Sequence, residues 1–183
     1  MTTLQPPVST AAAVLMGGGS TRMGRPKQHV ALDGVTMGAA AIKLAQQSCG
    51  LVVISGPSDA MPGLDHIADR SEHAGHGPLA GIEAVLASGQ AARWLILPCD
   101  MPALTIGSLE RLLASTADLA AFQDPAQPSE PLPLPLVIRA SMYESVFAYL
   151  NTSRRSIRGW MESVGVACVG AIDASETRNI NHL

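Results

Sequence analysis

Between residues 14 and 27 the chain carries the residue types that hold a polyphosphate. The run Val14-Leu-Met-Gly-Gly-Gly-Ser-Thr-Arg-Met-Gly-Arg-Pro-Lys27 places three adjacent glycines, Gly17–Gly19, before two cations, Arg22 and Lys27. Glycines let backbone N–H groups approach an anion closely, and the cations supply the charge that phosphate oxygens require. Because three consecutive glycines weaken any regular element, the segment predicts a phosphate-binding loop rather than a plain turn.

Two well-known phosphate-binding motifs do not fit this loop. The stretch from Gly19 to Gly24 has the spacing of a Walker A motif, but Arg25-Pro26 stands where that motif requires Lys-Ser/Thr. In a dinucleotide fingerprint the third glycine would fall at Arg22. The loop therefore indicates binding of a polyphosphate outside these two classes.

A second candidate is the carboxylate of Asp100, in Leu95-Ile-Leu-Pro-Cys-Asp-Met-Pro102. The apolar run before it predicts a buried strand, and ligands of open α/β sheets bind outside the carboxyl ends of the strands. The glycine loop follows its own apolar run, Ala11–Met16, so both groups should meet at one edge of a sheet. A carboxylate beside phosphates suits Mg²⁺. The alternative is an aspartate that caps the next helix.

Two weaker motifs lie in later turns. Asp69 precedes Gly77-Pro-Leu-Ala-Gly81, which predicts a turn just before a helix. Free N–H groups there suit an anion or the edge of a base, and a simple helix start is the alternative. In Arg178-Asn-Ile-Asn181 the Asn side chains could bridge a phosphate or a metal-bound water, although a solvated tail would present the same residues.

Two other groups of polar residues invite a chemical interpretation: the histidines His66, His73 and His76, and the arginines Arg154, Arg155 and Arg158. The neighbouring glycines indicate a loop and not a regular element, which disfavours a structural metal site. The arginines are expected on the solvated face of a helix. The alternative is that they hold an acidic substrate.

Apolar strand-like runs alternate with helix-like segments, which predicts an α/β fold with a parallel sheet and helices on both faces. The expected strands are 11–16, 51–54, 66–68, 93–97, 119–122 and 166–172, and the expected helices are 37–47, 79–88, 106–115, 141–150 and 156–164. We expect a flexible tail over residues 1–10 and one domain over residues 11–183. Five prolines crowd residues 123–135, which predicts a long loop or edge segment and not a central strand or a helix.

Composition excludes several classes of protein. Hydrophobic residues make up 47% of the 183 residues but aromatic residues only 3%, so the core should be aliphatic. The net charge is −3 and the basic residues are scattered, which argues against a nucleic-acid partner. The apolar run that ends before Gly17 is too short to span a membrane, and three widely separated cysteines suggest no disulfide framework. We expect a cytoplasmic protein.

The motifs, taken in order, resemble the molybdenum cofactor guanylyltransferase family. Its glycine loop corresponds to Leu15–Gly24 with Lys27, and later hallmarks correspond to Gly77-Pro-Leu-Ala-Gly-Ile82 and Pro98-Cys-Asp-Met-Pro102. Its later region corresponds to Glu130-Pro-Leu132, Ser156-Ile-Arg-Gly-Trp160 and the closing Asn179-Ile-Asn181. The resemblance covers nearly the whole chain. It implies a single nucleotidyltransferase domain with a Rossmann-like three-layer sandwich, similar to the nucleotide-diphospho-sugar transferases.

The resemblance also implies a reaction and roles for residues. Such enzymes transfer GMP from Mg-GTP to the terminal phosphate of molybdopterin and release pyrophosphate; transient contact with proteins that donate or accept the cofactor is also implied. Arg22 and Lys27 would stabilise the triphosphate, and Asp100 would hold Mg²⁺. The remaining nucleotide-binding positions implied are Leu15, Gly17, Gly18, Gly19, Lys27, Asp69, Gly77, Pro78, Leu79 and Asn181. No nucleophilic side chain is needed, because the acceptor phosphate is already an anion.

Some positions depart from the guanylyltransferase pattern. Met16 replaces a small alanine in the loop, and Arg25-Pro-Lys27 is more similar to the sister molybdopterin cytidylyltransferases. The family pattern continues beyond Asn-Ile-Asn, whereas this sequence closes with His182-Leu183. The alternative activities are therefore transfer of CMP to molybdopterin, transfer of a nucleotide to another small anion, and a nucleotide-binding regulatory module without turnover.

Overall fold

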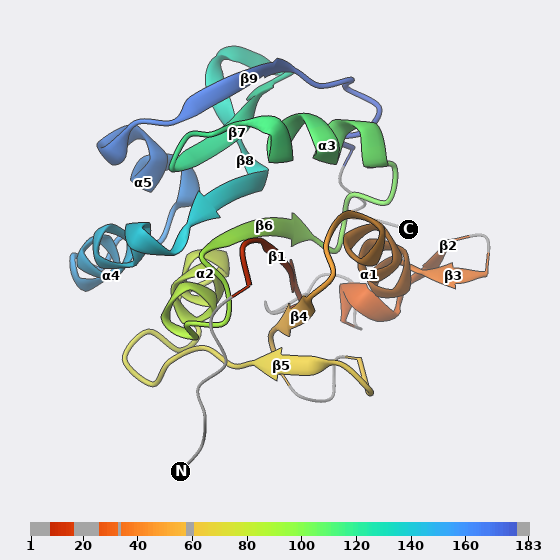
Figure 1. The fold of residues 1–183 in the computed structure, drawn as a ribbon, viewed down its shortest axis with the longest axis horizontal. Helices are drawn as coiled ribbons and strands as arrows, with labels where there is room; N and C mark the ends of the chain where they lie inside the picture. The colour runs from red at the N-terminus through yellow and green to blue at the C-terminus, as the bar shows by residue number, and fades with distance from the viewer. Residues whose placement is uncertain (1–7, 17–25, 33, 58–60, 179–183) are drawn as a thin grey trace.

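Seven strands form the central sheet of the computed structural model, which describes residues 8–16, 26–32, 34–57 and 61–178 (Figure 1). In chain order they are β1 (Ala11–Leu15), β4 (Val52–Ser55), β5 (Asp65–Ile67), β6 (Arg93–Pro98), β7 (Leu119–Asp124), β8 (Gln127–Arg139) and β9 (Ala167–Ala171). Their order across the sheet is β5-β4-β1-β6-β8-β7-β9. Most neighbours are parallel, and β8 is antiparallel to both β6 and β7. The predicted mostly parallel sheet is confirmed.

β1 lies at the centre of the parallel half, between β4 and β6. All five of its residues are buried, as expected for a short apolar strand that is covered on both faces. Alternate residues face opposite layers: Ala13 and Leu15 pack in one apolar cluster, and Ala12 and Val14 in the other. One uninterrupted apolar run therefore supplies both halves of the core.

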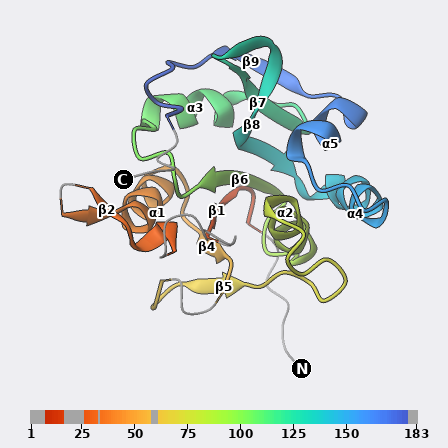
Figure 2. The same cartoon turned by 180° about the vertical axis from the view of Figure 1, so that it is seen from behind.

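Helices cover both faces of the sheet, giving the predicted three layers (Figures 1 and 2). One face carries α1 (Met37–Ser48) and α3 (Ile106–Ala114), and the other carries α2 (Pro78–Ala87), α4 (Tyr143–Asn151) and α5 (Ile157–Val164). The apolar cluster between the sheet and α2, α4 and α5 contains both tryptophans of the chain: Trp94 from β6 and Trp160 from α5 are fully buried in it.

The helices begin where local chemistry satisfies their first N–H groups. Side-chain oxygens of Thr36, Thr105 and Ser156 accept hydrogen bonds from the first turns of α1, α3 and α5. α2 differs, because its N-cap is Gly77, which has a φ of 80° and no side chain, and Pro78 follows at the first helical position. The start of α2 therefore leaves its amide groups without a side-chain cap.

Most of the proline-rich segment is a strand, which corrects the expectation of a long loop over residues 123–135, but its proline-rich part is paired on one side only, as in the edge segment that was the other expectation. β8 lies between β6 and β7 in the sheet, but its pairing with β6 covers only its proline-free end, Leu136–Arg139. The proline-rich part pairs with β7 through an irregular register. Since proline removes one ladder hydrogen bond, a strand can contain several prolines where it is paired on one side.

Shorter elements complete the chain and were not predicted. A 3-10 turn, η1 (Lys27–His29), follows the region of the glycine loop, and β2 (Ala31–Leu32) and β3 (Val35–Thr36) form a small hairpin before α1. A second 3-10 turn, η2 (Ala140–Met142), precedes α4. Near the start of the chain Val8 forms a parallel bridge with Ala91. Within the described residues, none of the helices is long and apolar enough to cross a membrane.

Candidate active site

The carboxyl ends of four parallel strands meet at one edge of the sheet. Leu15 at the end of β1 is in register with Ser55 of β4 and Pro98 of β6, and Ser55 is in register with Ile67 of β5. The segments that leave these strands carry the glycine loop, Asp69 and Asp100. Parallel pairing therefore brings the strands that precede these motifs to a single edge, which was predicted for the two strands before the glycine loop and Asp100.

Lys27 and Asp100 form an ion pair at this edge. The Lys27 Nζ atom donates to Asp100 Oδ2 over 2.8 Å, although the residues are 73 positions apart in the chain. Their side chains are 24% and 18% exposed, so the pair is partly shielded from water but open to a ligand. Asp100 does not cap α3, because Thr105 does so. The alternative assignment of Asp100 as a helix cap is therefore wrong.

Lys27 is held by the packing of η1 against the start of α1. Gln28, its neighbour, is buried, and its Cβ and carbonyl oxygen each lie 3.0 Å from the position that a Cβ would take on Gly38. The Met16 methyl lies 3.3 Å from the same position. Because Gly38 has no side chain, both η1 and the end of β1 can pack against the start of α1. Met16, one departure from the family pattern, fills this space.

Asp69 and the start of α2 form a second corner of the edge. Asp69 Oδ2 accepts a hydrogen bond from the Gly75 amide over 3.2 Å, which closes the loop before α2. A Cβ added to Gly81 would clash with Ser55 Oγ and would lie 3.7 Å from Asp69 Oδ1. Gly81 therefore lets α2 pack closely against the ends of β4 and β5.

The predicted binding residues differ in what they can offer a ligand. Pro78 is exposed, whereas Leu79 is fully buried in the core, and Leu15 is 8% exposed. A buried leucine side chain cannot contact a ligand, so only the backbone of Leu79 is suited to binding. Gly77 presents backbone alone and is exposed.

Cys99, beside Asp100, is a buried thiol and not a nucleophile. Burial raises the pKa of Cys99 to about 12, and the Asp100 carboxylate adds to the increase. The thiol therefore stays protonated at neutral pH, when a reactive cysteine would have to be a thiolate. This agrees with a reaction that uses no covalent intermediate on the protein.

Arg158 belongs to a partly buried charge cluster in the other half of the molecule. It donates to Asp124 Oδ2 over 2.7 Å and also hydrogen-bonds Glu130, joining α5 to β7 and β8. The expectation of three arginines on the solvated face of a helix is wrong for Arg158, which is on α5 but paired with carboxylates. Arg154 and Arg155 are exposed as expected, but they lie between α4 and α5 and not on a helix. Nothing local in the sequence indicates the two carboxylates that meet this arginine.

The segment after β9 returns to the start of α3. Glu176 accepts hydrogen bonds from the Thr105 amide over 3.0 Å and from the Thr105 hydroxyl over 2.8 Å. Arg111 donates to the Ala171 carbonyl over 2.6 Å. Five predicted site residues lie outside the described part of the chain: Gly17, Gly18, Gly19, Arg22 and Asn181.

Two features of this region were missed in the sequence, although each left a signal. Ser55 is a polar residue that directly follows the apolar run Leu51–Ile54, and it is buried at the strand edge. Glu83 is a lone charge within the otherwise uncharged segment of α2, and it is fully buried. A single polar residue at such a position indicates a specific partner, but the sequence does not say which one.

Comparison with known sequences gives consistent results. A family described as MobA-like NTP transferase domain matches residues 12–167. A molybdenum cofactor guanylyltransferase of Shewanella putrefaciens is 31% identical over 188 residues, which cover 97% of this chain and 94% of that protein. A probable molybdenum cofactor guanylyltransferase of Bacillus mycoides is 25% identical, with 89% and 84% covered.

Solved structures share the fold. The molybdopterin-guanine dinucleotide biosynthesis protein A of Archaeoglobus fulgidus aligns with a TM-score of 0.72 and 21% identity, covering 93% of this chain and 92% of that one. The 2-C-methyl-D-erythritol 4-phosphate cytidylyltransferase of Thermus thermophilus aligns with a TM-score of 0.68 and 14% identity, covering 93% and 92%. The fold thus occurs in proteins named for different bases.

Proposed function

The chain belongs to the MobA-like NTP transferase family, and from this premise we propose that it transfers GMP from Mg-GTP to the terminal phosphate of molybdopterin, releasing pyrophosphate. The observation that carries the proposal is the Lys27–Asp100 ion pair at the carboxyl edge of β1 and β6. It joins a cation for phosphate and a carboxylate for a metal at the place where such sheets bind ligands.

The reaction needs positioning and charge neutralisation more than side-chain chemistry. The acceptor phosphate attacks the α-phosphorus of GTP, a new P–O bond forms, and the bond to pyrophosphate breaks. Negative charge builds on the phosphate oxygens, and a fixed ammonium group stabilises it. We propose this role for Lys27, which is part of η1, and propose that Arg22 shares it. The neutral Cys99 thiol takes no part.

The donor chemistry of Asp100 fits Mg²⁺. Among the described residues there is no group of three or more His, Cys, Asp or Glu side chains that could hold a metal. A cation here would therefore take most of its ligands from phosphates and water, which is the habit of Mg²⁺ and not of zinc. Asp100 would hold the ion, and the ion would neutralise charge on the triphosphate.

The second corner of the edge suits the nucleoside. Asp69 offers a carboxylate that can accept from a base or ribose, and Gly77, at the exposed start of α2, offers a backbone N–H that can donate, whereas Pro78 has no N–H and could only pack against the ligand. The Leu79 amide would belong to the same group. We propose that the glycines Gly17, Gly18 and Gly19 cradle the phosphates and that Asn181 lies near them.

Cytidylyl transfer is the second candidate, because the sequence Arg25-Pro-Lys27 is similar to the cytidylyltransferase branch. The two activities share the phosphate chemistry and differ in the base that is bound. We propose a cytoplasmic enzyme in either case, with transient contact to proteins that deliver or receive the cofactor.

The decisive experiment measures pyrophosphate release from GTP, CTP, ATP and UTP with Mg²⁺, each with and without molybdopterin. Release that requires molybdopterin and favours GTP is the expected result. Preference for CTP would replace the guanylyl assignment with the cytidylyl one. Release that does not depend on molybdopterin would contradict both, and binding of nucleotide without turnover would identify a regulatory module.

A further inference from the structure

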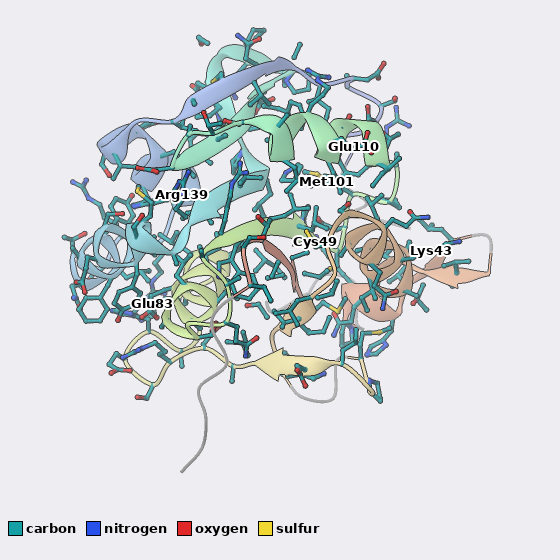
Figure 3. All side chains as sticks on the ribbon, viewed as in Figure 1. Lys43, Cys49, Glu83, Met101, Glu110 and Arg139 are labelled. Atoms are coloured by element: carbon teal, nitrogen blue, oxygen red, sulfur yellow. The ribbon has the colours of Figure 1, made fainter. Side chains whose placement is uncertain are left out.

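A fully buried carboxylate lies behind the corner that carries Asp69 and Gly77. Glu83 is 0% exposed and sits on α2 on the side that is turned toward α4 (Figure 3). Its Oε1 lies 3.2 Å from Arg70 Nε, and its Oε2 lies 3.6 Å from His73 Nδ1. Neither contact has the geometry of a hydrogen bond, so Glu83 is held by charge attraction to the Arg70 guanidinium at short range. Since a buried charge is costly without a partner, this nearby cation offsets part of the cost of burying Glu83.

Both partners come from the loop between β5 and α2, residues 69–77. The loop is a series of turns in which the His73 amide donates to the Arg70 carbonyl and the His76 amide donates to the His73 carbonyl, each over 3.0 Å. The Asp69 carboxylate accepts a hydrogen bond from the Gly75 amide and so joins the start of the loop to its end. The two ends of the loop are thus at the proposed nucleoside corner, and its middle is attached to Glu83.

α4 holds the middle of the loop from the other side. The Asn151 Oδ1 atom lies 3.2 Å from His73 Nε2, and the Phe147 ring packs edge-on against His73 at 5.3 Å. The Arg70 guanidinium lies 5.9 Å from the centre of the Tyr143 ring. Burial raises the pKa of Tyr143, and the Glu83 carboxylate adds to the increase. The loop is therefore clamped between α2 and α4.

We infer that Glu83 is a positioning residue: by binding the middle of the 69–77 loop through Arg70 and His73, it preorganises the ends of the loop for the nucleoside. The inference rests on the proposed function, which places the nucleotide at Asp69 and Gly77. A loop that is already ordered spares the ligand the entropic cost of ordering it. The expected signature is tighter nucleotide binding with no contribution to the chemical step.

The test is Glu83→Gln, which keeps the shape of the side chain and removes its charge. We expect the Kd and KM for GTP or CTP to rise about three- to tenfold. The kcat and the KM for molybdopterin should stay unchanged. The matched control is Glu72→Gln, because Glu72 pairs with the same Arg70 at 3.4 Å but is exposed. The control should change none of these constants.

A second variant approaches the same contact from the loop. Arg70 is 40% exposed, so Arg70→Gln should fold even if Glu83→Gln does not. It should raise the nucleotide Kd in the same direction. Where both variants fold, the Kd of the double variant for nucleotide should be close to that of the single variant with the higher Kd. The reason is that both changes break the same Arg70–Glu83 contact.

Direct binding of GTP and CTP separates this inference from the proposed function. If the wild type binds a nucleotide but transfers it to no acceptor, the proposed reaction fails while the ratio of Kd values still tests Glu83. If the folded variants bind nucleotide as tightly as the wild type, or lose kcat and not affinity, Glu83 does not position the loop. A wild type that binds neither nucleotide would overturn both proposals.

Discussion

The two halves of the sheet use charged side chains differently. In the half built from β1, β4, β5 and β6, charges gather where parallel strands end, and the Lys27–Asp100 pair remains 24% and 18% exposed. In the half built from β7, β8 and β9, Arg158 ties α5 to two strands through Asp124 and Glu130. The two arrangements are similarly exposed, since Arg158, Asp124 and Glu130 are 25%, 12% and 37% exposed. The first lies at the carboxyl ends of parallel strands and the second joins three elements, so position in the fold, and not exposure, separates a candidate site from a structural cross-link. We call the first half of the sheet the open half and the second the closed half.

The largest effect should come from Asp100→Ala, which tests the open half. We expect Mg²⁺-dependent transfer to fall by about a thousandfold, since the proposed metal and charge site is lost. The melting temperature should change little because Asp100 is partly exposed. Pyrophosphate release and thermal unfolding measure the two quantities. Asp118→Ala is the control, since Asp118 is an exposed carboxylate that also pairs with a cation, Arg139. Equal losses of transfer activity in the two variants would mean that Asp100 is not a site residue.

Lys27→Ala should follow, with a loss of about a hundredfold in kcat and a smaller change in nucleotide Kd. The ammonium group is expected to act most strongly as charge develops on the phosphates. Steady-state kinetics measure the change in kcat, and direct nucleotide binding measures the change in Kd. Lys43→Ala is the matched control, because Lys43 is an exposed residue of α1 (Figure 3). A purely affinity-based loss at Lys27 would contradict the proposed role.

Gly81→Ala tests the close packing behind the open half. Its new Cβ would clash with Ser55 Oγ, and we expect a loss of about 1–3 kcal/mol in the free energy of unfolding. Denaturant unfolding measures the loss, and Ser55→Ala in the same chain should recover part of it. Gly107→Ala in α3 meets no neighbour within 4 Å and should be neutral or slightly stabilising. Without recovery by Ser55→Ala, the clash would not be the cause.

Arg158→Gln tests the closed half and should have the smallest effect, about 1–2 kcal/mol of stability at neutral pH. Burial raises the pKa of Asp124, but hydrogen bonds from Arg158 and the Ala126 amide outweigh it, so that pKa lies below its ordinary value. A lowered folded-state pKa contributes stability above the ordinary aspartate pKa, and this stability disappears as the pH falls through the folded-state value.

The difference in the free energy of unfolding between wild type and Arg158→Gln should therefore have its full value at neutral pH and become smaller below about pH 4. Urea unfolding at several pH values gives this profile. A difference that does not depend on pH would mean that packing, and not the charge cluster, carries the effect. A loss of nucleotide binding in this variant would instead place Arg158 with the site and break the contrast between the halves.

The parallel half was predictable because its signals are local. An apolar run that ends in glycine or aspartate indicates a buried strand together with the polar residues that follow its carboxyl end. Lys27 and Asp100 were singled out as candidates from this pattern. β8 was missed because proline statistics describe an average strand, and only the sheet shows that its proline-rich part pairs on one side. Glu83 and Arg158 were missed because their partners are brought by tertiary packing from other elements.

The two tryptophans in one apolar cluster give the molecule an intrinsic fluorescence signal for the packing of its two halves. Trp94 belongs to the open half and Trp160 to α5 of the closed half, and these two residues are all the tryptophan in the chain. Both indoles are fully buried in one cluster. Their fluorescence should therefore lie at short wavelength and shift to the red together when the halves separate. Since neither lies at the ligand edge, nucleotide should leave this emission nearly unchanged.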